Sequence, residues 1–186
     1  CAHWTVEEHP KMVAPQLVVD AVRGVGSVKE LCIVGGEPLV HPQRVLQIVE
    51  GIDDLPVRTS IITNGVPCTP AFVDQLRGRD VHLVFSIDTL DRDRWRWIRG
   101  KDSMERVFRN LRHVRRVLEP EQLSVQSVLA EETREDIAEV GRWCAERGIH
   151  QSIQPYVQEG FDGQWTPPRE PQTMPDQRDP AVDSVC

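Results

Sequence analysis

The chain has 186 residues, a formal net charge of −7 and a hydrophobic fraction of 39%. This length suits one domain, or one domain with a tail. The negative charge argues against a nucleic-acid partner, because binding phosphates requires a basic face. No apolar run approaches the roughly 20 residues that span a bilayer, so we expect no membrane partner either.

Apolar runs that predict strands alternate along the chain with amphipathic stretches that predict helices. The strands are predicted at 28–34, 57–62, 81–87, 123–129 and 149–157. The helices are predicted at 15–23, 42–51, 70–77, 103–118 and 134–147. Such alternation is typical of parallel strands joined by right-handed crossovers. It predicts an α/β fold, and it leaves an open doubly wound sheet and part of a (β/α) barrel as alternatives.

Local signals support the predicted helix boundaries. Asp102 and Glu105 fit a capping box at the start of the fourth helix, and Thr133 is expected to cap the fifth. Pro42 and Pro70 stand at the starts of two other helices. The backbone N–H at such a position makes no hydrogen bond within the helix, so proline, which lacks it, is tolerated there.

The alternating pattern ends after residue 157. Residues 159–186 are rich in proline and polar residues, so we expect a linker or disordered tail after a core of residues 1–158. The chain does not begin with Met, which suggests a fragment, so the lack of a targeting segment proves little. Cys32 and Cys144 fall in apolar patterns as buried hydrophobes, and no dense cysteine framework is visible, so we expect a reducing, cytoplasmic compartment.

The most informative motif is Val34-Gly35-Gly36-Glu37-Pro38-Leu39, which closes the first predicted strand. Adjacent glycines at the carboxyl end of a strand let a ligand approach the backbone closely. The carboxylate that follows suits an ammonium group, so the glycines and the acid together suit a zwitterion. In isolation, the four residues Gly-Gly-Glu-Pro would be interpreted as a tight turn.

Three further polar motifs fall at the same edge of the predicted sheet. Cys1-Ala2-His3-Trp4 precedes the first helix, Thr63-Asn64-Gly65 follows the second strand, and Ser86-Ile87-Asp88 ends the third. Polar side chains after successive parallel strands converge on one pocket. No Gly-x-Gly-x-x-Gly or P-loop pattern follows any strand, which argues against an ordinary nucleotide-binding enzyme.

The order and spacing of these motifs resemble those of the radical S-adenosylmethionine (SAM) enzymes. The Gly-Gly-Glu-Pro motif begins 34 residues after Cys1, and the chain also carries Ile61-Ile62-Thr63-Asn64-Gly65, Ser86-Ile87-Asp88 and Ile98-Arg99-Gly100. The resemblance covers about residues 1–157. It implies a partial (β/α)6 TIM-like barrel that lacks its first strand in this chain.

Members of this family bind a [4Fe–4S] cluster through CxxxCxxC, because thiolates suit iron–sulfur clusters. Cys1-Ala2-His3-Trp4 is similar to a third ligand that continues as Cys-x-x-Trp. The resemblance therefore implies that Cys1 is a cluster ligand and that the first strand and two ligands lie upstream. In the alternative, Cys1 is the second ligand and Trp4 replaces the third, which would describe a clusterless binding or scaffold protein.

The resemblance also implies roles for residues at the strand ends. Gly35, Gly36, Glu37 and Pro38 are expected to meet the methionine part of SAM. The other residues expected to bind SAM are Thr63, Asn64, Ser86, Asp88, Ser127 and Gln154. Structural alternatives stay open: Glu37 as a loop-stabilising acid, turn chemistry for Thr63 and Asn64, capping of the following helix by Asp88, and a strand-ending proline beside Gln154.

The implied function is a radical SAM enzyme that cleaves SAM with its cluster and starts radical chemistry on an unidentified substrate, with a peptide or small molecule favoured. An electron donor such as flavodoxin or ferredoxin is an implied partner. The Arg-rich segment around Trp95 and Trp97 is expected to cover the barrel mouth or to pack beside Arg side chains.

Overall fold

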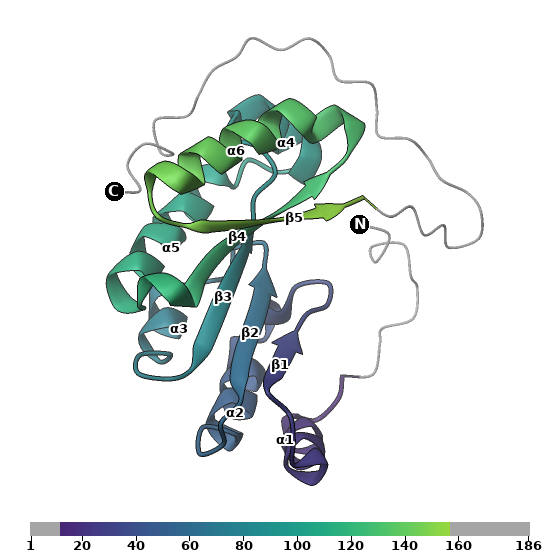
Figure 1. Ribbon diagram of the computed structural model, residues 1–186, viewed down its shortest axis with the longest axis vertical. Coiled ribbons are helices and arrows are strands. Elements are labelled where there is room, and N and C mark those ends of the chain that lie inside the picture. The colour runs from purple at the N-terminus through teal and green to yellow at the C-terminus, as the bar shows by residue number, and fades with distance from the viewer. Residues whose placement is uncertain (1–11, 157–186) are drawn as a thin grey trace, which may run out of the picture.

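A five-stranded parallel sheet in the order β1-β2-β3-β4-β5 forms the centre of the computed structural model, which describes residues 12–156 (Figure 1). The strands are β1 (Glu30–Ile33), β2 (Arg58–Thr63), β3 (Val81–Ser86), β4 (Leu123–Leu129) and β5 (His150–Pro155). The α-helices are α1 (Pro15–Val25), α2 (Pro42–Gly51), α3 (Pro70–Asp74), α4 (Arg92–Arg99), α5 (Met104–Val117) and α6 (Arg134–Glu146). Three short 3-10 helices are η2 (Pro38–Val40), η3 (Pro120–Gln122) and η4 (Glu131–Thr133). The predicted α/β class and parallel strands are confirmed.

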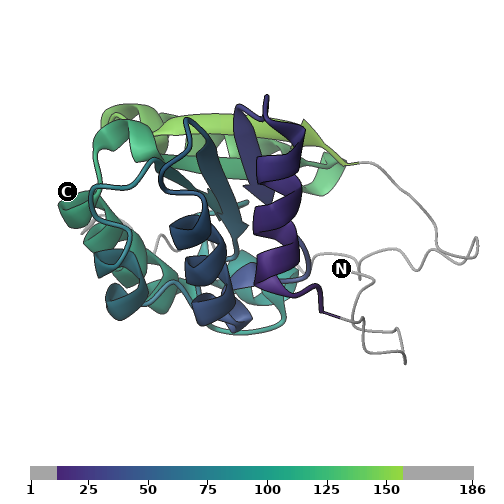
Figure 2. The same ribbon diagram turned by 90° about the horizontal axis from the view of Figure 1, so that it is seen from below.

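The helices lie on one side of a curved sheet, and its other side stays open among the described residues (Figures 1 and 2). Ile61, Leu83, Phe85 and Val125 point toward the helices and are fully buried in the core. The residues between them along each strand point to the opposite, inner face, because strand side chains alternate. A curved parallel sheet with helices outside it is part of a barrel, so the barrel alternative is the one that the structure adopts.

One helix, α4, has no counterpart in the sequence prediction. Asp91 caps it by accepting the backbone N–H of Arg94 at 2.7 Å, and Gly100 ends it with a left-handed φ of 67°. Only Trp95 of this helix is buried, so the segment lacks the repeating apolar stripe that identifies a helix from sequence.

Three aromatic rings join α4, α5 and α6 into one core. The ring of Phe108 meets that of Trp143 edge to face, with centroids 5.4 Å apart, and that of Trp95 at 6.2 Å. Such a pair contributes about 0.5–1.5 kcal/mol beyond the area that it buries. The guanidinium of Arg99 lies 5.5 Å from the centroid of the Trp95 ring, and Arg94 lies 5.9 Å from that of Trp97. Packing beside arginines is therefore confirmed for both tryptophans.

Pro42 and Pro70 begin α2 and α3 as predicted. The side-chain caps predicted for α5 and α6 are wrong. Ser103 is the N-cap residue of α5, and the carboxylate of Asp102 accepts hydrogen bonds from the arginines of α4 instead. Thr133 does occupy the N-cap position of α6. Its hydroxyl donates to the carbonyl of residue 128 and accepts from the N–H of residue 130, so it joins β4 to η4 and leaves the helix uncapped.

The first strand is also less buried than its apolar sequence predicts. β1 is an edge strand of the described sheet, and its residues alternate between exposed and half-buried. Leu31 and Ile33 pack toward the helices, whereas Cys32 points to the inner face and is exposed. The prediction of a buried Cys32 is therefore wrong, because an apolar run does not reveal that one face of the strand lacks a covering layer. Cys144 is buried as predicted.

None of the helices within residues 12–156 is long and apolar enough to cross a membrane. The predicted tail at 159–186 lies outside the described residues, as does Cys1, so the division into a core of 1–158 and a tail stays a prediction.

Candidate functional site

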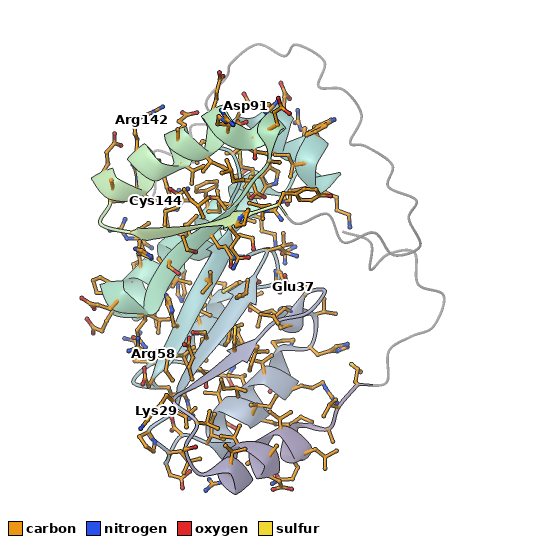
Figure 3. The ribbon with its side chains drawn as sticks, turned by 45° about the vertical axis from the view of Figure 1, so that its right-hand side comes forward. Lys29, Glu37, Arg58, Asp91, Arg142 and Cys144 are labelled. Carbon is orange, nitrogen blue, oxygen red and sulfur yellow. The ribbon has the colours of Figure 1, made fainter. Side chains whose placement is uncertain are left out.

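The predicted site residues of the described part lie near the carboxyl ends of the strands or in the loops that follow them. Glu37 lies beyond the end of β1 on this edge of the sheet (Figure 3). Loops from neighbouring parallel strands meet at one edge, so the segments after β1, β2 and β3 are brought together as the sequence predicts.

The carboxylate of Glu37 links the loop after β1 to the loop after β2. Its Oε1 accepts the hydroxyl of Thr63 at 2.7 Å and the backbone N–H of Leu39 at 3.1 Å, and its Oε2 accepts the backbone N–H of Asn64 at 2.8 Å. The bond to Leu39 also caps η2, which Pro38 begins. Both carboxylate oxygens therefore serve the protein itself, as the loop-stabilising alternative for Glu37 requires.

The two glycines ahead of Glu37 lie at an open surface. Gly35 and Gly36 are exposed, and a Cβ placed on either would meet no atom within 4 Å. Their peptide groups are thus reachable from outside while the Glu37 hydrogen bonds fix the loop that carries them. A loop with this combination can present backbone carbonyl and N–H groups to a ligand.

Two hydrogen bonds within the turn also engage the side chains of Thr63 and Asn64. The buried Thr63 hydroxyl accepts the N–H of Gly65 at 3.1 Å, and Asn64 Oδ1 accepts the N–H two residues further on at 2.9 Å. Gly65 has a left-handed φ of 78°, and a Cβ there would lie 2.7 Å from the Phe85 ring. The Gly65 carbonyl accepts the side-chain amide of Asn110 in α5 at 2.8 Å. The hydrogen bond from Asn110 thus connects this turn to α5.

Asp88 joins three elements near the end of β3. Its Oδ1 accepts the backbone N–H of Val128 at 2.9 Å, and its Oδ2 accepts the Arg99 guanidinium at 2.8 Å. Arg99 also donates to the backbone carbonyl of Ser86 at 2.8 Å. Asp88 does not cap the next helix, because Asp91 does, so that alternative is wrong.

Arg99 is the residue at this edge that sequence reasoning passed over. Its side chain keeps 24% of its surface exposed, so it brings a positive charge to the end of β3. The Arg-Gly pair at 99–100 was visible in the sequence, but its place depends on α4, which was not predicted.

The last two predicted residues lie away from this group. Ser127 is fully buried, donates to the Ile87 carbonyl at 2.6 Å and accepts from Gln151 at 2.9 Å. Gln151 in turn donates to a carbonyl of α6, so the Ser127 hydroxyl faces the helices. Gln154 is exposed and pairs with Val128 of β4. It lies on β5, which is at the other end of the strand order from β1.

Within the described part of the chain, no three His, Cys, Asp or Glu residues form a group that could hold a metal ion. Burial raises the pKa of the Cys68 and Cys144 thiols to about 12. Partial burial, and then the charge of Glu30, raise the pKa of Cys32 as well. These three cysteines therefore remain protonated thiols at neutral pH.

Comparison with known proteins identifies the family of this chain. The sequence profile described as the Radical SAM superfamily matches residues 1–144. The chain therefore belongs to the radical SAM superfamily, and the resemblance seen in the motifs is confirmed.

Two curated proteins match shorter stretches of the chain. The radical SAM cyclopropyl synthase TigE of Paramaledivibacter caminithermalis is 34% identical over 88 residues, which is 45% of this chain and 19% of that protein. The uncharacterized protein MJ0804 of Methanocaldococcus jannaschii is 28% identical over 78 residues, or 41% of this chain and 27% of that protein. The matched stretches thus span about a quarter or less of these relatives.

Among solved structures, Streptococcus suis SuiB bound to the precursor peptide SuiA has a TM-score of 0.67 at 19% identity. That alignment covers 82% of this chain and 35% of the SuiB chain. SuiB bound to S-adenosylmethionine gives a TM-score of 0.66, also at 19% identity, over 84% of this chain and 36% of SuiB. Identity this low supports the fold alone, and that fold is the partial barrel predicted from the motifs.

Proposed function

We propose that this chain is the SAM-binding core of a radical SAM enzyme. The observation that carries the proposal is the open backbone at Gly35 and Gly36, which Glu37 holds against the loop after β2. Family membership supports the same ligand, because this edge of the sheet carries the motifs that the family shares.

The charges at this edge suit the two ends of an amino acid. Backbone carbonyls of the glycine loop accept hydrogen bonds from the ammonium group of SAM, with the Glu37 carboxylate nearby to favour its positive charge. The SAM carboxylate needs a cation, and Arg99 supplies one near the end of β3, beside the partly exposed Ser86. Asp88 has the role of a positioning residue, because it holds the Arg99 guanidinium.

A [4Fe–4S] cluster, when bound, supplies the electron that reductive cleavage of SAM requires. Residues 12–156 do not offer three ligands for it, so in this proposal Cys1 acts together with cysteines outside the described part. An electron donor such as flavodoxin or ferredoxin and a reducing cytoplasmic compartment belong to the same proposal.

A peptide or another polar molecule is the substrate that we propose. The inner face of the sheet carries partly exposed polar side chains on three adjacent strands, namely His82, Ser86, Gln126 and Ser152. These groups offer hydrogen bonds to an extended polar chain. The similar fold of SuiB has been solved with its precursor peptide, which supports this class of substrate.

The test measures SAM binding by calorimetry in the full-length protein, reconstituted with iron and sulfide without oxygen. Gly36→Val should weaken SAM binding by about tenfold or more, because its side chain enters the open space over the loop. Gly24→Val is the matched control, since Gly24 in α1 is also exposed and open but lies away from this edge. Equal SAM affinity in a folded Gly36→Val protein would reduce the motif to a structural turn.

The alternative is a clusterless barrel that binds or scaffolds without redox chemistry. Cluster absorbance that changes when SAM is added distinguishes the two functions. A full-length protein that holds no iron after reconstitution supports the alternative.

A further inference from the structure

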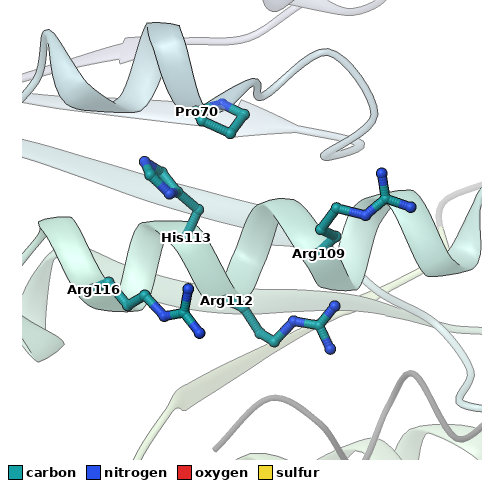
Figure 4. A pocket seen from close by; sticks show the side chains of 5 residues that line it. All are labelled: Pro70, Arg109, Arg112, His113 and Arg116. Atoms are coloured by element: carbon teal, nitrogen blue, oxygen red, sulfur yellow. The ribbon is translucent and has the colours of Figure 1, made fainter.

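A basic groove runs along the outer side of the barrel, away from the proposed SAM site. It has a volume of about 430 Å³ and lies between α3 and α5 (Figure 4). The residues that line it are Pro70, Arg109, Arg112, His113 and Arg116. A concentration of arginine is unexpected on a chain whose net charge is −7, so this surface differs in sign from the average exterior.

Two of the four basic side chains in the groove already have acidic partners. Arg109 pairs with Glu105 at 3.0 Å one helical turn earlier, and His113 contacts Asp74 of α3 at 2.8 Å. Arg112 and Arg116, by contrast, have no hydrogen bond or ion pair with any residue in 12–156. Both extend side by side from α5 in Figure 4.

The spacing of these two arginines indicates the shape of an anionic ligand. They lie four residues apart on one helix, which separates them by about 6 Å along its axis. Carboxylates on alternate residues of an extended peptide are about 6.6 Å apart, and those one helical turn apart are separated by about 6 Å. The planar guanidinium binds a carboxylate through two parallel hydrogen bonds, so each arginine can hold one acidic side chain.

The surroundings favour a peptide over a nucleic acid. Glu105 and Asp74 flank the groove, and they would repel a backbone that carries a charge on every nucleotide. A peptide can place its carboxylates at Arg112 and Arg116 alone. Pro70 adds an apolar surface for one of its uncharged side chains.

We propose that this groove is a docking site for an acidic segment of a partner protein, with Arg112 and Arg116 as the two carboxylate-binding residues. The groove lies on the helix side of the sheet, so docking leaves the glycine loop and the inner face free. The proposal does not depend on SAM binding or on the cluster.

The test is fluorescence anisotropy with a labelled peptide of alternating Glu and Ser, added to the full 186-residue chain at low ionic strength. The double variant Arg112→Gln/Arg116→Gln should bind this peptide about tenfold more weakly than the wild type. The charge-conserving variant Arg112→Lys/Arg116→Lys should show a smaller loss, because lysine keeps the charge without the planar fork. Circular dichroism checks that each variant is folded.

Arg142→Gln is the matched control, because Arg142 is an exposed arginine on α6 outside the groove. It should change the affinity by less than about twofold. An equal loss in the control would show general charge attraction and overturn the proposal. So would undetectable binding of the Glu-Ser peptide, equal binding of a Lys-Ser peptide, or tighter binding of a single-stranded RNA.

Discussion

The carboxylate of Glu37 accepts a hydrogen bond from the backbone N–H of Asn64 at 2.8 Å, across 27 positions of sequence. This bond and the one from the Thr63 hydroxyl fasten the glycine loop to the neighbouring strand end. The acid of the Gly-Gly-Glu-Pro motif thus fixes the position of the loop, and the two glycines leave open space beside its backbone.

We expect Glu37→Gln to destabilise the protein, although the two side chains have nearly the same shape. Glu37 accepts three hydrogen bonds, and the amide of glutamine would turn a donor toward one of those donors. The free energy of unfolding should fall by about 1–3 kcal/mol, as for a buried donor that loses its partner. Urea denaturation measures it, with the exposed Glu121→Gln as the control. Equal stability of the Glu37 variant and the wild type would contradict a stabilising role for these three hydrogen bonds.

A methyl group should reduce the stability of the protein much more at Gly65 than at Gly36. Gly65→Ala should lose about 2–4 kcal/mol of stability, because its φ is left-handed and the new Cβ would press on the Phe85 ring at 2.7 Å. Gly36→Ala should stay within about 0.5 kcal/mol of the wild type, since its Cβ would enter open space. Thermal unfolding compares the two. A large loss at Gly36 would mean that the loop is needed for folding rather than for a ligand.

The strands and most helices could be predicted because their apolar residues repeat with the period of the element. α4 was missed because only Trp95 of its eight residues is buried, and its boundaries depend on Asp91 and Gly100. The motifs after the first three strands lie at one edge of the sheet, as predicted. The sequence could not assign the polar atoms there, because Glu37 and Asp88 each have a partner that lies far along the chain, 27 and 40 positions away. Ser127 shows the same limit, since only the structure reveals that its hydroxyl faces the helices.

The three described cysteines should differ strongly in their reaction with iodoacetamide. Cys32 is exposed on the inner face, whereas Cys68 and Cys144 are buried and their pKa values are raised to about 12. In a chain with Cys1 and Cys186 replaced by Ser, mass spectrometry at pH 8 should find Cys32 labelled first. Glu30→Gln should speed that labelling, because the Glu30 charge helps to raise the pKa of Cys32. Labelling of Cys144 before Cys32 would contradict the burial described here.

His82 should be uncharged at neutral pH and should lower the stability of the protein as the pH falls. Partial burial lowers its pKa below the usual value, Arg58 and His150 act in the same direction, and Glu30 opposes them. The unfolded chain therefore takes up this proton first, near pH 6.5, while the folded protein takes it up at lower pH. Between those two values the unfolded state binds more protons, so stability is lost as pH falls through this window and is unaffected above it.

Two measurements test the behaviour of His82. An NMR titration of the His82 ring should give a pKa below 6.5, and Arg58→Gln should raise that pKa by removing a nearby cation. In urea denaturation, His82→Asn should lose less stability than the wild type between pH 7.5 and the acid side of the window, because asparagine takes up no proton. A His82 pKa above 6.5, or identical pH dependence in the two proteins, would show that the inner face does not disfavour positive charge at this position.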